Sequence, residues 1–380
     1  MLKINTYSSL IPLKISVVIM MMLIVLPYGD AFAQKKKKKK TQNLEIRLRL
    51  STTYDNNILK YSDKYLQRFM NGEDEGRFHI NTYDDLILFT SLKMYYTFRV
   101  FGKLKSIAST EISRRTYLVN DIKNWNYWYV GFQQYFTKRA SLKLSYSYIP
   151  AFYVRHFRNR QWVEEYGFTP ETFKPYVFSK DYFGVSFQNT YFKNTRISLS
   201  LNYARYFHNE YFTEYDSKDF IYGIRLYQPI HKKIRLKASY EFVTSDAKGY
   251  NSITETPETS LGPDATFAED RFSLGFLWYL PRISNYRHNL DVKFGVLLRY
   301  YSSKYSPITD PLHAGRVDNN YRFSTVYRFN FSKSLQLSAY YKLFLRDSGT
   351  TSVINDWYVS NEKDYSQYHL GVEITYKINY

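Results

Sequence analysis

Acidic and histidine side chains gather in one short stretch, and these residue types could act as a general acid and a general base. The stretch "HNEYFTEYDSKD" supplies His208, Glu210, Glu214, Asp216 and Asp219. Sequence neighbours do not fix a catalytic geometry, however, and a solvated polar loop would explain the same residues. The chain has seven His but no H-E-x-x-H or G-x-S-x-G motif. We therefore predict no catalytic residue and no enzyme activity. A hydrolase acting at this loop is the least favoured alternative.

The sequence contains no cysteine, which excludes disulfides, thiolate metal sites and cysteine nucleophiles. The histidines show no paired spacing of the kind that binds metals. We accordingly expect neither a metal ion nor a cofactor.

Lysine and arginine instead alternate with apolar residues. In "NLEIRLRLSTTYDNN", Leu44, Ile46, Leu48 and Leu50 alternate with Glu45, Arg47, Arg49 and Ser51. Side chains two residues apart lie on the same face of a strand. One face of this strand is therefore pure hydrocarbon, and the other is charged.

The same alternation recurs along the chain, and strands of this kind would have to position the charged side chains. We identify fourteen two-faced segments, at residues 44–54, 86–100, 104–118, 125–137, 140–153, 180–192, 195–207, 219–229, 233–245, 269–280, 288–302, 320–331, 334–346 and 365–380. Long polar connections alternate with short ones, and the even number puts both chain ends on the short-turn side. This pattern is typical of outer-membrane barrels. We predict an all-β, transmembrane, antiparallel up-and-down barrel that closes between segments 44–54 and 365–380.

A soluble β-sandwich also alternates and is the structural alternative. Its strands usually have about 5–6 residues, whereas a tilted membrane strand needs about 9–11. The segments here reach the greater length, which favours the membrane barrel. We expect Leu48, Leu144, Leu236 and Phe294 to face lipid. The inner face should hold six strand glycines, which are Gly131, Gly184, Gly223, Gly275, Gly295 and Gly371.

The last segment, "HLGVEITYKINY", has a polar-x-Gly-x-x-hydrophobic-x-aromatic pattern at His369, Gly371, Ile374 and Tyr376. This pattern resembles the terminal signal of Gram-negative outer-membrane barrels. With "TYDNNI" after the first segment and the Tyr-rich strands, the chain looks like porin-type barrels of Bacteroidota-like bacteria. The resemblance implies outer-membrane lipid around the barrel and recognition of its last strand by the barrel-insertion machinery. The acidic stretch at 208–219 resembles the rim of outer-membrane aspartyl-type proteases.

The N-terminal region has the three parts of a secretory signal. Lys3 and Lys14 are basic, "ISVVIMMMLIVL" is apolar, and Ala31-Phe32-Ala33 is an A-x-A cleavage site. We expect residues 1–33 to be a signal peptide, 34–43 a Lys-rich periplasmic tail and 44–380 the barrel, with both termini periplasmic. The formal net charge is +19, but export argues against a nucleic-acid partner.

The inward positions of the predicted strands are rich in lysine and arginine. Acidic residues are fewer at these positions. Many of the acidic residues lie in the long loops instead, as in "NGEDE" at 71–75. Further inward cations are Arg99, Lys105, Arg115, Lys143, Arg271 and Lys377. The candidate pore-lining and anion-binding residues are Arg47, Arg49, Lys93, Arg225, Arg235, Lys237, Lys293, Arg299, Arg322, Arg328 and Lys342.

Three cross-strand pairs follow from folding the predicted hairpins. Folding about His231 would set Arg225 opposite Lys237. Folding about Ser332 would set Arg322 opposite Lys342, whereas Lys93 would face Glu111. Like charges across a ladder repel, so the first two pairs would attract a negative group.

Two functions fit these features. The first is a porin-like outer-membrane channel whose basic lumen favours small anionic solutes. The second is a structural or assembly barrel whose lumen is closed by loops, and the long connection 55–85 favours it. Fourteen strands lie between the filled eight-stranded barrels and the open porins of 16–18 strands, so the strand number fits both.

Overall fold

The structure, a computed structural model, describes residues 43–380 except 102–103 and 261–262. The predicted signal peptide (1–33) and all but the last residue of the predicted Lys-rich tail (34–43) lie outside the described residues.

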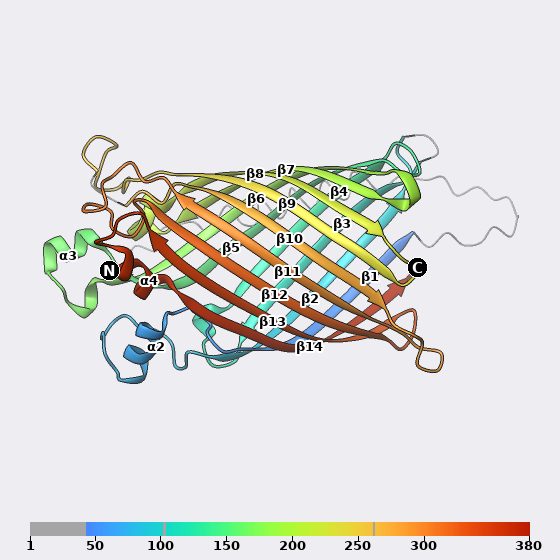
Figure 1. The fold of residues 1–380 in the computed structure, drawn as a ribbon, viewed down its shortest axis with the longest axis horizontal. Helices are drawn as coiled ribbons and strands as arrows, with labels where there is room; N and C mark the ends of the chain where they lie inside the picture. The colour runs from blue at the N-terminus through green and yellow to red at the C-terminus, as the bar shows by residue number, and fades with distance from the viewer. Residues whose placement is uncertain (1–42, 102–103, 261–262) are drawn as a thin grey trace, which may run out of the picture. The chain divides into compact units, whose positions relative to one another are not determined.

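Fourteen antiparallel strands form one closed barrel, in which every strand pairs with its neighbours in sequence and β1 pairs with β14 (Figure 1). The predicted strand number, order and closure are confirmed. The strands are β1 (Leu44–Asp55), β2 (Asp85–Phe98), β3 (Ser106–Tyr117), β4 (Trp125–Tyr135), β5 (Ser141–Arg158), β6 (Phe173–Thr190), β7 (Arg196–His208), β8 (Ser217–Pro229), β9 (Ile234–Ala247), β10 (Phe267–Tyr279), β11 (Arg287–Tyr301), β12 (Arg316–Asn330), β13 (Leu335–Thr350) and β14 (Tyr365–Asn379).

The largest difference from the predicted boundaries is in the β5–β6 hairpin, which is longer than expected at its loop end. Register shifts occur between Ile149 and Phe152 and between Tyr153 and Arg155. Each irregularity disturbs the alternation of faces, so the sequence pattern stops before the pairing does. Beyond them the ladder continues as far as Arg158 opposite Phe173.

Helices occur only in the connections between strands in the described part of the chain. They are α2 (Asp63–Met70), α3 (Arg160–Tyr166) and α4 (Asp356–Lys363), with short 3₁₀ segments η2 (Asp121–Lys123), η3 (Pro170–Thr172), η4 (Phe192–Asn194) and η5 (Glu210–Tyr215). Figure 1 shows α2, α3 and α4 at one end of the barrel and the C-terminus at the other. We call the first end the loop end and the second the short-turn end. None of the described helices is both long and apolar enough to cross a membrane.

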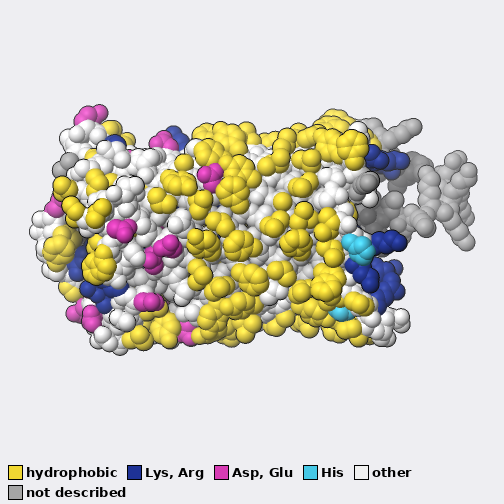
Figure 2. Space-filling model, viewed as in Figure 1, with side chains coloured by type: hydrophobic (Ala, Val, Ile, Leu, Met, Phe, Trp, Pro, Cys, Tyr) yellow, Lys and Arg dark blue, Asp and Glu magenta, His cyan; other side chains and the backbone are white. Residues whose placement is uncertain are grey.

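The outer wall of the barrel is apolar. Leu48, Leu144 and Phe294 are 42%, 47% and 48% exposed on it. Leu236 is half-buried and lies on the same face, directly opposite the exposed Phe276 of β10. Figure 2 shows hydrophobic side chains over the side wall, with acidic side chains toward the loop end and basic ones at both ends. An apolar outside around a polar inside is the arrangement of a transmembrane barrel.

The six strand glycines lie opposite inward-facing residues, as predicted, and one of them is required by close packing. A Cβ at Gly371 would lie 2.5 Å from Cζ of Tyr340 and 2.7 Å from the carbonyl oxygen of Thr52. Because the Thr52 oxygen belongs to the backbone of β1, a larger residue would force β14 away from β1, and the ring of Tyr340 on β13 would also have to move.

Substitution by arginine should distinguish the two faces of one strand. Leu274 and Ser273 are adjacent on β10; Leu274 is 45% exposed on the outer wall, and Ser273 faces the interior. We expect Leu274→Arg to lower the free energy of unfolding by about 2–4 kcal/mol and Ser273→Arg to have almost no effect. Urea unfolding in lipid vesicles measures both values, and equal destabilisation would contradict the assignment of faces.

Candidate functional site in the barrel interior

A chamber of about 830 Å³ lies inside the barrel, lined by residues of β6 to β13. It begins near the short turns, where Arg196 starts β7 and Arg328 approaches the end of β12, and reaches residues such as Leu297 in the middle of β11. The lining includes two carboxylates, Glu241 and Asp291, and eight cations, which are Arg196, Arg225, Lys237, Arg271, Lys293, Arg322, Arg328 and Lys342. Cations therefore exceed carboxylates by six in this chamber.

Each of the two carboxylates is shared by two cations. Asp291 accepts from Lys237 Nζ at 2.8 Å and from Arg328 Nη1 at 3.0 Å. Glu241 lies 2.7 Å from Arg225 Nη2 and 3.7 Å from Arg271 Nη1. The other four lining cations, which are Arg196, Lys293, Arg322 and Lys342, have no carboxylate of the described residues within ion-pair distance. The positive excess of the chamber is concentrated on these four side chains.

The predicted pairing of like charges across the two hairpins is wrong. Arg225 lies opposite Ser239, and Lys237 lies opposite Tyr227. The centre of this turn is one residue later than predicted, which moves every partner by two residues. A shift of two preserves the face of each side chain but changes its neighbour.

The second hairpin shows the same correction. Arg322 lies opposite Phe344, and Lys342 lies opposite Ser324. The third predicted pair is confirmed, because Lys93 lies opposite Glu111 with 2.9 Å between Nζ and Oε2.

Six of the eleven candidate residues line the chamber, and five do not. Arg49 and Lys93 share the buried Glu111, at 2.6 Å and 2.9 Å. Arg47 pairs with Glu45 and lies in register between Lys93 and Lys377.

Arg299 is bound to the buried Glu269 at 2.7 Å, and Arg235 donates to the hydroxyl of Tyr227. Of the two other chamber cations, Arg271 is one of the further inward cations of the sequence analysis, and Arg196 was not predicted to face inward. Arg196 is the first residue of β7, and at the end of a strand the alternation does not indicate on which face of the barrel wall a side chain lies.

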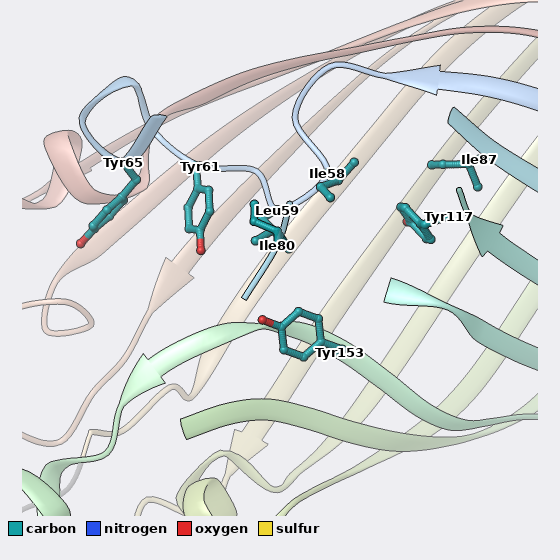
Figure 3. Close-up of a cluster of buried hydrophobic side chains, with 8 residues drawn as sticks. All are labelled: Ile58, Leu59, Tyr61, Tyr65, Ile80, Ile87, Tyr117 and Tyr153. Atoms are coloured by element: carbon teal, nitrogen blue, oxygen red, sulfur yellow. The ribbon is translucent and has the colours of Figure 1, made fainter. Parts of the chain in front are cut away.

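The connection between β1 and β2, residues 56–84, folds inward at the loop end of the barrel. Its buried side chains form a cluster with strand residues, as Figure 3 shows. The loop supplies Ile58, Leu59, Tyr61, Tyr65 and Ile80, and the strands supply Ile87 of β2, Tyr117 of β3 and Tyr153 of β5. Tyr61 is only 1% exposed. We call this group the loop cluster.

Hydrogen bonds hold the same loop to two separate strands of the barrel. Nη2 of Arg155, on β5, donates to the backbone oxygen of Lys60 at 3.1 Å. Nε2 of Gln367, on β14, donates to the backbone oxygen of Asn57 at 3.0 Å. Because β5 and β14 are five strands apart around the barrel, the loop spans part of the lumen. Lys64 of α2 also pairs with Glu362 of α4.

The acidic and histidine stretch at 208–219 is part of this packed end. The ring of His208 lies 4.8 Å from that of Tyr176, and its Nδ1 lies 3.3 Å from Asp216 Oδ1. Asp219 instead accepts a hydrogen bond from Ser245 at 2.7 Å. No group of three or more His, Asp or Glu among the described residues could hold a metal ion. The contacts of the stretch are those of a packed loop.

Glu214, in η5, should make stability depend on pH. Burial raises the pKa of its carboxyl to about 7, and nearby Glu255 and Asp216 raise it further. In the unfolded chain the carboxyl ionises near its ordinary pKa of about 4.3. Between these values the folded protein holds the proton and the unfolded chain releases it, so stability falls as pH rises.

We expect Glu214→Gln to raise the unfolding midpoint in urea relative to the wild type, with the gain growing from about pH 4.3 to pH 7 and level above it. Glu210→Gln changes an exposed carboxylate of the same segment and is the matched control. If the unfolding midpoints of the wild type and Glu214→Gln change with pH in parallel, the raised pKa of Glu214 is contradicted.

The closed barrel, its apolar wall and its charged interior together define the class of a transmembrane β-barrel. No protein-family model matches this chain, and comparison with curated protein sequences gave no match.

Solved structures with a similar fold include the following three. The outer membrane channel DcaP of Acinetobacter baumannii is 12% identical, with 90% of this chain and 99% of that chain covered and a TM-score of 0.45. The anion-selective porin from Comamonas acidovorans is 10% identical, covers 88% and 98%, and has a TM-score of 0.41. OccK1 (OpdK) of Pseudomonas aeruginosa is 9% identical, covers 89% and 99%, and has a TM-score of 0.39.

Proposed function

We propose that this protein is an outer-membrane channel that favours small anionic solutes. The observation that carries the proposal is the chamber, where eight cations face two carboxylates. Charges of one sign inside a narrow tube with low-dielectric walls concentrate ions of the opposite sign and repel their own. Solutes with negative charge would therefore enter the chamber more readily than cations of similar size.

The proposal includes an orientation. The short turns, the start of β1 and the end of β14 all lie on one rim. There Leu44 and Tyr380 are hydrogen-bonded through their backbones. In outer-membrane barrels the short turns are periplasmic and the long loops extracellular. The chamber would then open toward the periplasm, and the loop cluster would narrow the path at the outer end. Outer-membrane lipid would surround the wall, and the barrel-insertion machinery would recognise β14.

A second function is favoured by the loop cluster itself. A lumen closed by buried residues such as Tyr61 and Tyr153 suits a structural or assembly barrel that conducts nothing. The two functions differ in one measurable property, which is conductance.

The test is the reversal potential of the purified protein in a planar bilayer under a KCl gradient. Anion preference is expected, and a reversal potential of the sign set by K⁺ would overturn the proposal. If neither the wild type nor a variant with a shortened β1–β2 loop conducts, the channel function is excluded in favour of the structural barrel.

A further inference from the structure

Two parallel rows of residues cross the chamber wall from β8 to β13. Within each row, successive residues are direct partners in the ladders, and basic residues are separated by serine or glycine. The first row is Lys237, Gly275, Lys293, Ser324 and Lys342. The second row is Arg225, Ser239, Ser273, Gly295 and Arg322. All ten residues line the chamber.

The small residues make a shallow floor between the long basic side chains. Gly275 and Gly295 have no side chain, and the hydroxyls of Ser239 and Ser273 lie 2.6 Å apart. Serine hydroxyls can donate to an anionic oxygen that approaches the wall. A solute can therefore reach the floor while cations contact it from the sides.

Three of the basic residues surround one of these serines. Lys293 and Lys342 are the direct partners of Ser324 on its two sides. Arg322 lies two residues from Ser324 on β12, so it is the diagonal neighbour of both lysines. Diagonal neighbours lie about 7–8 Å apart, a distance that long side chains bridge.

These three cations are also the ones without a carboxylate among the five cations of the two rows. Lys237 is bound to Asp291 and Arg225 to Glu241. Lys293, Arg322 and Lys342 have no carboxylate among the described residues within ion-pair distance, and the Nζ of Lys342 lies 4.7 Å from the centre of the Tyr340 ring. Arg322 is the diagonal neighbour of both lysines, and like charges at neighbouring ladder positions repel, so a ligand that brings several negative charges relieves the arrangement.

We propose that Lys293, Arg322, Lys342 and Ser324 form a binding site for solutes that carry two or more anionic groups, such as oligophosphates or polycarboxylates. This inference rests on the proposed function of an anion channel and names its solute class. A monovalent anion can satisfy one cation, whereas a polyanion can contact all three at once. Multiple charge-assisted hydrogen bonds then give selectivity by charge number rather than by sign alone.

The test is calorimetric titration of the purified full chain in detergent with tripolyphosphate, citrate, orthophosphate and acetate. We expect tripolyphosphate or citrate to bind at least tenfold more tightly than the singly grouped anion of the same chemistry. A preference for tripolyphosphate alone would identify phosphates as the solutes, and a preference for citrate alone would identify carboxylates. Absence of any preference for the multiply charged anions would overturn the inference.

Matched variants test the location of the site. The variant Lys293→Gln/Arg322→Gln/Lys342→Gln should lose at least tenfold in affinity for tripolyphosphate. The control Lys105→Gln/Lys143→Gln/Lys377→Gln removes the same charge from residues outside the chamber lining and should lose less than threefold. Equal losses would show a diffuse field and no site.

Ser324→Leu retains every charge and fills the floor, so it should also weaken binding; unchanged affinity in that variant would overturn the role of the floor. Anion preference in the bilayer without preference for polyanions would defeat this inference and leave the channel function standing. Specific polyanion binding without conductance would defeat the channel function and leave the polyanion site standing.

Discussion

Shortening the β1–β2 connection should open the barrel. Replacement of residues 58–81 by a short Gly-Ser linker removes all the loop residues of the loop cluster, including the fully buried Tyr61. We expect a several-fold rise in single-channel conductance, because the conductance of a pore is limited by its narrowest part. The barrel itself should remain closed, since the ladders on both sides of β1 and β2 do not involve the loop.

The matched control is removal of residues 252–259, an almost entirely exposed part of the connection between β9 and β10. The single-channel conductance of this deletion variant should equal that of the wild type. If the β1–β2 variant conducts no better than this control, the loop cluster is not the constriction.

Reversal of the unpaired charges should abolish the anion preference. The variant Lys293→Glu/Arg322→Glu/Lys342→Glu leaves five cations and five carboxylates in a lining that began with eight and two. We expect its reversal potential under a KCl gradient to move close to zero. Lumen substitutions change selectivity more than stability, so the variant should still fold into a barrel.

The same charge change at Lys105, Lys143 and Lys377, outside the chamber lining, is the control and should shift the reversal potential less. An unchanged reversal potential in the chamber variant would mean that the chamber does not set selectivity.

The faces of the strands could be predicted from the sequence because alternation has a period of two residues. Ser273 and Leu274, or Arg47 and Leu48, differ so strongly in polarity that their faces are clear. Ladder partners could not be predicted equally well, since they depend on the exact centre of each turn. Alternation therefore assigns Arg225 and Lys237 to the correct wall, but the predicted turn centre gives each of them the wrong neighbour.

Neither the chamber nor the loop cluster could be predicted from the sequence, and the reasons differ. The chamber depends on which cations are neutralised, and the pairing of Lys237 with Asp291 joins residues on β9 and β11, two strands apart. The loop cluster depends on contacts between residues 58–80 and Tyr153, which no periodic pattern signals. A hint was present in the apolar and aromatic residues of a connection otherwise rich in charge, such as Ile58, Leu59 and Tyr61.

The seam between β1 and β14 has a consequence for how the barrel forms. Every other ladder joins strands that follow each other in the chain, so those hairpins are local and their loop-closure entropy is small. Among the strands that the structure describes, the seam alone joins two that are far apart in sequence, with Arg47 opposite Lys377 across it. Non-local pairing is the slow part of folding, because the chain is ordered before the contact is gained. We therefore expect the barrel to assemble through a series of local strand pairings followed by one late step, in which β1 pairs with β14.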